Sequence, residues 1–156
     1  MKPYYLALFM FIFSVPSAYA LSVQPDLFID QAWVQEGPPN ARVLAGFMLI
    51  KNNSAQTINI TAAHSTQFKK IEFHRTVHVD GMAKMEPQKN LTILPGKTLK
   101  LEHGSFHLML IEPVNKLKAG DHVEINMTLS NKTVVPVSLT VRTPDQNQSQ
   151  HQHHHH

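Results

Sequence analysis

Short runs in which apolar and polar residues alternate, separated by turn-forming residues, constrain the fold of this chain more than any other feature. The separating segments are rich in Gly, Pro, Asn and Asp, and no stretch keeps the 3.6-residue apolar period of a helix. The pattern predicts a single all-β domain, built as an antiparallel sandwich or a small barrel. The predicted strands are Leu27–Val34, Ala45–Lys51, Thr57–Ala63, Lys70–Val79, Lys97–Leu101, His107–Ile111, His122–Leu129 and Thr133–Val141.

The first twenty residues have the composition of a secretory signal peptide. Lys2 precedes the apolar run Tyr4–Val15, and Ala18-Tyr19-Ala20 has the small-x-small pattern that signal peptidase recognises. The apolar run is too short to span a bilayer, so we expect cleavage after Ala20 and no stable membrane insertion. Residues 1–20 are therefore predicted to be a cleaved signal, and residues 21–144 to form the folded domain.

The C-terminal residues 145–156 form a tail without any apolar residue, DQNQSQHQHHHH. Such a segment cannot bury a core and is predicted to be disordered. Two interpretations remain open, a native metal-gathering tract or an expression tag. If the tract is native, we expect it to bind Cu(II). Its histidines are His151, His153, His154, His155 and His156.

The chain contains no cysteine, but it has eleven histidines and seven methionines. The absence of cysteine excludes disulfides, thiolate zinc sites, iron–sulfur clusters and blue-copper centres. A metal would have to be held by imidazole, thioether or oxygen ligands. The net charge of +3 and the scattered basic residues give no reason to expect nucleic-acid binding.

One histidine and one methionine flank a predicted β-hairpin. Asp80-Gly81 is the strongest two-residue turn signal in the chain, with His74 before it and Met85 after it. If these two residues form the loop, Met85 pairs with Thr76. Thr76 lies on the same face of its strand as His74, so His74 and Met85 are predicted to be diagonal neighbours on one face.

A second such pair lies further along the chain. His107 and Met109 are two residues apart in a predicted strand, so their side chains point to the same face. Whether the two pairs meet depends on which strands are neighbours, and the sequence leaves this open. Two neutral imidazoles and two soft thioethers would suit Cu(I) better than Zn(II), Mg(II) or Ca(II).

The spacing of these four residues, H-x10-M-x21-H-x-M, resembles the signature of the periplasmic copper chaperones of the PCuAC family. The resemblance extends over about Leu27 to Val141. Other segments that resemble motifs of the family are Ala32-Trp33, Pro38–Ala41, Ala45–Met48, Lys51–Asn53, Asp80–Met85, Gly104–Leu110 and Leu117–Asp121.

The resemblance implies a cupredoxin-like Greek-key β-barrel that holds one Cu(I) near its surface in the periplasm. It also implies delivery of copper to the copper A subunit of cytochrome c oxidase, alone or with a Sco-like thiol protein. We expect the protein to act as a monomer. The metal ligands implied by the resemblance are His74, Met85, His107 and Met109.

Two positions depart from the family pattern. Asn40 stands where Gly is usual, and His103 stands where Pro or Gly is common. His103 is either an outer metal ligand or an exposed loop histidine. Met82 is an extra thioether near the turn, but the predicted register points it away from Met85.

A metal carrier explains these residues better than an enzyme. Catalysis requires an open coordination position with an acid or base beside it, and four protein ligands leave little room for one. Two other functions remain as alternatives. One is a periplasmic copper buffer or resistance protein, and the other is a metal-free secreted β-sandwich that serves as an interaction module.

Overall fold

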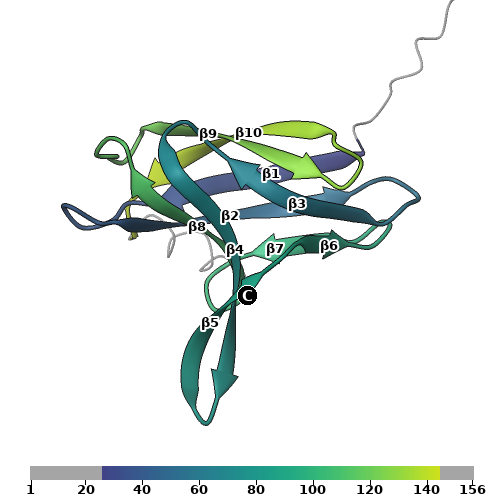
Figure 1. Cartoon of the computed structure of the whole chain (residues 1–156), viewed down its shortest axis with the longest axis horizontal. Coiled ribbons are helices and arrows are strands. Elements are labelled where there is room, and N and C mark those ends of the chain that lie inside the picture. The colour runs from purple at the N-terminus through teal and green to yellow at the C-terminus, as the bar shows by residue number, and fades with distance from the viewer. Residues whose placement is uncertain (1–25, 145–156) are drawn as a thin grey trace, which may run out of the picture.

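The protein is built from β-strands. The structure, a computed structural model, describes residues 26–144, in which ten strands follow one another without an α-helix (Figure 1). The prediction of a single all-β, cupredoxin-like domain is confirmed. The strands are β1 (Leu27–Gln35), β2 (Val43–Asn52), β3 (Ile58–His64), β4 (Phe68–Val79), β5 (Met82–Gln88), β6 (Leu91–Ile93), β7 (Thr98–Leu101), β8 (Phe106–Pro113), β9 (His122–Leu129) and β10 (Val134–Arg142).

All eight predicted runs form strands, and the return arm of the predicted hairpin is β5. The strand that the sequence did not indicate is β6, since three residues are too few to display an alternating pattern. The predicted signal peptide and the histidine-rich tail lie outside the described residues. Within the described residues, no helix is long and apolar enough to cross a membrane.

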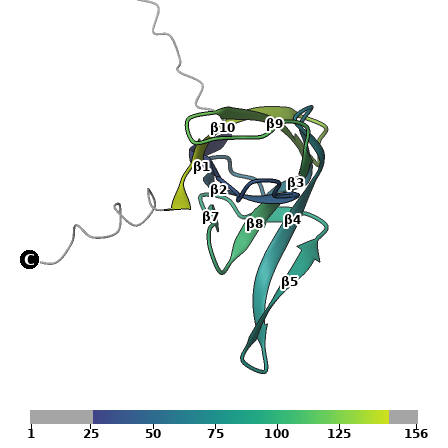
Figure 2. The same ribbon diagram turned by 90° about the vertical axis from the view of Figure 1, so that its left-hand side faces the viewer.

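The strands form one sheet in the order β5-β4-β8-β7-β2-β1-β10-β9-β3-β6, and β2 also pairs with β8. Strands distant in sequence are therefore neighbours, as in the expected Greek-key arrangement. The sheet curls so that β3 and β4, which are far apart in this order, approach each other and enclose the interior (Figure 2). This topology places β4 beside β8, the two strands that carry the predicted histidines.

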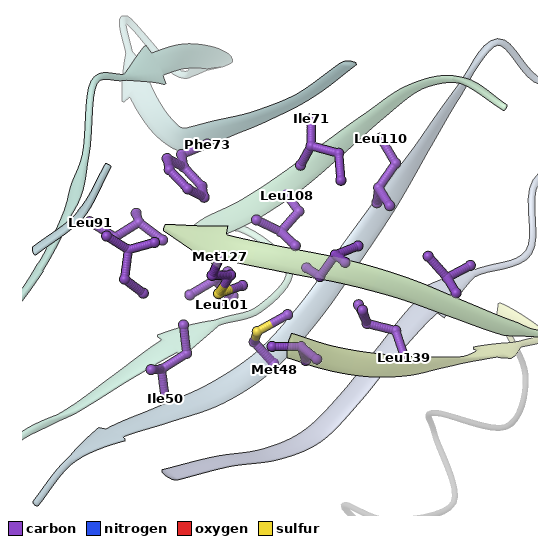
Figure 3. Packing of buried hydrophobic residues seen from close by; sticks show 14 of the residues in the cluster. Met48, Ile50, Ile71, Phe73, Leu91, Leu101, Leu108, Leu110, Met127 and Leu139 are labelled. Atoms are coloured by element: carbon purple, nitrogen blue, oxygen red, sulfur yellow. The ribbon is translucent and has the colours of Figure 1, made fainter. Parts of the chain in front are cut away.

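The core occupies the interior of this curled sheet. Ile71 and Phe73 of β4 and Leu108 and Leu110 of β8 point into it together with side chains from the other strands (Figure 3). Because side chains alternate along a strand, the intervening residues of β4 and β8 point away from the core. The core therefore fixes the face on which the predicted metal ligands lie.

The second half of β4 and the whole of β5 extend beyond the barrel as a hairpin arm (Figures 1 and 2). Asp80 and Gly81 at its tip have φ angles of 52° and 77°, the left-handed conformation that a type I′ turn requires. The turn pairs Val79 with Met82 and Thr76 with Met85, so the register predicted from the sequence is confirmed.

Candidate metal centre

The two predicted histidines lie directly opposite each other on neighbouring antiparallel strands. His74 of β4 pairs with His107 of β8, and the centroids of their rings are 6.1 Å apart. Residues that pair in this way point to the same face of the sheet. The structure thus shows that the two histidine–methionine pairs lie on neighbouring strands, which the sequence alone left open.

Both imidazoles are buried although they point away from the core. His74 is 8% exposed and His107 is 5% exposed. His74 Nδ1 and His107 Nε2 are buried atoms without a hydrogen-bond partner. Buried polar atoms nearly always have a partner, so two unpartnered nitrogens on adjacent strands indicate a ligand-binding position.

The other nitrogen of each ring is hydrogen-bonded. His74 Nε2 donates to Glu72 Oε2 over 2.8 Å, and His107 Nδ1 donates to the backbone oxygen of Ser105 over 3.1 Å. Because these oxygens only accept, the protons lie on His74 Nε2 and His107 Nδ1. The lone pairs of the two unpartnered nitrogens are therefore free to bind a metal ion, an arrangement common in metal sites.

Glu72 is held in its ionised form. Its hydrogen bond with Lys70, and then its hydrogen bond with His74, lower the pKa of the Glu72 carboxyl below its usual value. An ionised carboxylate is a strong acceptor and fixes the orientation of the His74 ring. Glu72 lies two residues before His74 in β4, a spacing that could have suggested this role from the sequence, as could the position of Ser105 two residues before His107.

The two predicted thioethers lie on the same face as the histidines but differ in exposure. Met109 of β8 pairs with Glu72 and is partly buried. Met85 of β5 pairs with Thr76, one strand further out, and is 64% exposed. Met82 lies at a position of opposite parity in β5 and therefore points to the other face, as predicted.

Beyond the histidine pair, the described residues contain no group of three or more His, Asp or Glu side chains arranged to hold a metal. The thioethers of Met85 and Met109 share the face of His74 and His107 and are the candidate further ligands. The chemistry of this donor set, two neutral imidazoles and two thioethers, fits a soft monovalent ion.

An aromatic cluster lies on the same side of the sheet. Trp33 and Phe47 are buried outside the main core, with ring centroids 4.7 Å apart, and the ring of His103 lies 4.2 Å from that of Phe47. Ala45, two residues before Phe47 and on the same face of β2, pairs with Met109. His103 is thus an exposed residue packed on aromatic rings.

A cavity of about 620 Å³ lies elsewhere among the described residues. It is formed by the β1–β2 and β8–β9 connections, and Leu44 and Pro113 are among the residues that line it. Pro113 ends β8, whereas His107 is close to its start, so the cavity and the histidine pair are at opposite ends of this strand. The cavity contains none of the predicted ligands.

The chain is thus a curled all-β barrel in which two buried, unpartnered imidazoles and two thioethers share one face of the sheet. Residues 27–141 match the family described as "Putative lipoprotein LpqE-like". The chain therefore belongs to the LpqE-like family.

Two curated relatives are similar to this chain. "Putative lipoprotein Lxx21020" of Leifsonia xyli subsp. xyli is 28% identical over 115 residues, which cover 73% of this chain and 68% of the relative. "Uncharacterized protein RP573" of Rickettsia prowazekii is 28% identical over 109 residues, which cover 69% of this chain and 59% of the relative.

Solved structures share the fold. The solution structure of CuI-DR1885 from Deinococcus radiodurans is 30% identical, with a TM-score of 0.64, and the match covers 78% of this chain and 81% of that chain. The copper-bound PCuAC domain from PmoF2 is 15% identical, with a TM-score of 0.65, and the match covers 77% and 95%. The resemblance to the PCuAC family predicted from the sequence is thereby confirmed.

Proposed function

We propose that this protein is a Cu(I)-binding metallochaperone. The observation that carries the proposal is the pair of buried, unpartnered nitrogens, His74 Nδ1 and His107 Nε2, on adjacent strands. These nitrogens and the sulfur atoms of Met85 and Met109 would be the ligands. The similarity to CuI-DR1885, in which Cu(I) is bound, supports the choice of ion.

The ligand chemistry favours Cu(I) over divalent ions. Imidazole and thioether are neutral and polarisable, so they suit a soft ion of charge 1+ and balance a 2+ charge poorly. A thioether needs no deprotonation before it binds, and the hydrogen bonds to Glu72 and Ser105 already hold the two imidazoles in the binding tautomer.

The position of the site favours transfer of the ion over catalysis. Four protein ligands would leave no open coordination position for a substrate, so we propose that the protein is not an enzyme. Met85 lies on the exposed hairpin arm, where an incoming ligand could displace it first. Copper would then leave by exchange of one ligand at a time, inside a complex with the acceptor.

A thiolate is softer than a thioether and carries a negative charge, so it binds Cu(I) more strongly. Transfer of copper to a thiol-rich acceptor would therefore be favourable. We propose the copper A subunit of cytochrome c oxidase as the acceptor, reached directly or with a Sco-like thiol protein. Action in the periplasm, as a monomer, is part of the same proposal. It is supported by the family resemblance and by the signal-like residues 1–20.

The tail would add a second copper-binding function. We propose that its histidines, His151 and His153–His156, gather Cu(II), since imidazole-rich segments bind this ion well. Deletion of residues 150–156 is expected to remove Cu(II) binding and to leave Cu(I) binding unchanged, as measured by titration of each ion. Cu(II) binding that survives the deletion would exclude this role.

The proposal is tested by anaerobic titration with Cu(I) in competition with a chromophoric chelator. The unmodified chain is expected to bind one Cu(I) tightly, and His107→Ala and Met109→Ala are expected to lose this binding while keeping the fold. His122→Ala, which replaces an exposed histidine of β9, is the control and should bind like the unmodified chain. Undiminished binding by the first two variants would refute the site.

A further inference from the structure

We propose that His78 and Met85 form a second, exposed Cu(I) station on the hairpin arm, through which the ion enters or leaves the buried histidine pair. This inference rests on the proposed function, because it concerns the path of the same ion. None of the residues assigned to the buried site other than Met85 takes part in it.

The register of the arm places Met85 between two histidines. Met85 pairs with Thr76, and Thr76 is flanked on β4 by His74 and His78, each two residues away. All four side chains therefore point to one face of the hairpin. Met85 is a diagonal neighbour of both histidines, at about 7–8 Å between backbones, which long side chains can bridge.

The two histidines differ sharply in exposure. His74, at the base of the arm, is 8% exposed, whereas His78, near its tip, is exposed. Met85 is 64% exposed, and β5 is an edge strand of the sheet, with no further strand of residues 26–144 paired to its outer side. The face of the arm thus leads from a buried imidazole to an exposed one, with one thioether between them.

Met85 can serve both positions because its side chain is unbranched and has three rotatable bonds. At the station, copper would have one imidazole and one thioether, and its remaining positions would be open to ligands of the acceptor. In the exchange, the bond from copper to Met85 is kept. The bonds to His74, His107 and Met109 break, and a bond to His78 forms. Copper remains Cu(I), and no proton moves.

This role for His78 depends on the register of the hairpin arm. The distance of His78 from the other ligands depends on the turn, and a bulge or a longer loop would have placed Met85 on the opposite face. The observed turn at Asp80 and Gly81 removes this ambiguity, since it gives the pairing of His78 with Ala83 and of Thr76 with Met85.

The first test follows the methyl resonance of Met85 by NMR in the full-length His107→Ala variant, in which the buried pair is broken. Cu(I) added anaerobically is expected to shift the signals of the Met85 methyl group and the His78 ring together. Adding His78→Ala to this variant should abolish the Met85 shift. Adding His122→Ala, the matched control, should leave it. A Met85 shift that is the same with and without His78 would overturn the proposal.

The second test uses the otherwise unmodified chain, in which replacement of the exposed His78 does not threaten the core. After loading with one Cu(I), His78→Ala is expected to retain equilibrium affinity but to release copper more slowly to the chelator bicinchoninate. Equal release rates would overturn the station. Failure of the unmodified chain to bind Cu(I) tightly would instead refute the proposed function, so the two failures are distinguishable.

Discussion

At the scale of single residues, the candidate site is defined by which nitrogen of each imidazole carries the proton and donates a hydrogen bond. The Glu72 carboxylate accepts a hydrogen bond from Nε2–H of His74, and the carbonyl oxygen of Ser105 accepts one from Nδ1–H of His107. Each hydrogen bond leaves the other nitrogen unprotonated and without a partner. Glu72 and Ser105 thus act as positioning residues for the two proposed copper ligands.

Replacement of Glu72 tests this positioning role. Glu72→Ala is expected to lower Cu(I) affinity by about 10–100-fold, the usual effect of removing a residue that orients a metal ligand. Glu72→Gln keeps an oxygen that can accept the hydrogen bond from His74, so its Cu(I) affinity should fall less. The control is Glu112→Ala, because Glu112 also pairs with a lysine of β4 but lies far along β8 from His107. Equal affinities for Glu72→Ala and the control, measured by chelator competition, would contradict the role.

The same carboxylate predicts a pH dependence of stability. The pKa of Glu72 is lowered by Lys70 and then by His74, so its ionised form contributes stability above the ordinary pKa of a glutamate. This contribution is lost as the pH falls through the lowered pKa. Urea unfolding of the metal-free chain should show a stability advantage over Glu72→Gln at neutral pH that disappears in acid. A stability difference that grows as the pH falls would contradict the expected pH dependence.

At the scale of secondary-structure elements, the register of the hairpin arm and the pairing of β4 with β8 arise from different causes. The arm's register follows from local turn chemistry at Asp80 and Gly81, and it was predictable from the sequence. The pairing of β4 with β8 joins segments separated by many residues, and several strand orders could satisfy the same alternating pattern. The approach of His74 to His107 therefore required the structure.

Gly81 offers a direct test of the arm's contribution. Its φ of 77° is strained for a residue with a side chain, at about 1–2 kcal/mol, and no atom lies close enough to clash with an added Cβ. Gly81→Val is expected to disturb the turn, displace Met85 and weaken Cu(I) binding. Gly96→Val, at a similar φ in the β6–β7 turn, is the control and should bind Cu(I) normally in the same competition titration. Normal binding by both variants would show that the arm is dispensable.

At the scale of the whole molecule, the sequence predicted the all-β class and the face that each proposed ligand occupies. It missed the short strand β6, whose three residues carry no readable period. It also missed the burial of His74 and His107, because the alternation that points them away from the core suggests exposure.

Copper binding should also be visible in the stability of the entire domain. The proposed ligands come from β4, β5 and β8, so they are assembled only in the folded chain. Free Cu(I) at about 100 times its dissociation constant is expected to stabilise the fold by about 2.7 kcal/mol. Thermal unfolding under anaerobic conditions should show this gain in the unmodified chain and in His122→Ala, and lose it in His107→Ala. A gain of the same size in His107→Ala would place the ion elsewhere.

We propose that one Cu(I) is held by two imidazole nitrogens and two thioether sulfurs at the junction of β4, β5 and β8. X-ray absorption spectroscopy of the chain loaded with one equivalent of Cu(I) tests it most directly. Both nitrogen and sulfur neighbours are expected around copper in the unmodified chain, and this shell should be absent from Met109→Leu, which is expected to lose tight binding. A first coordination shell of nitrogen and oxygen alone, unchanged in that variant, would contradict it.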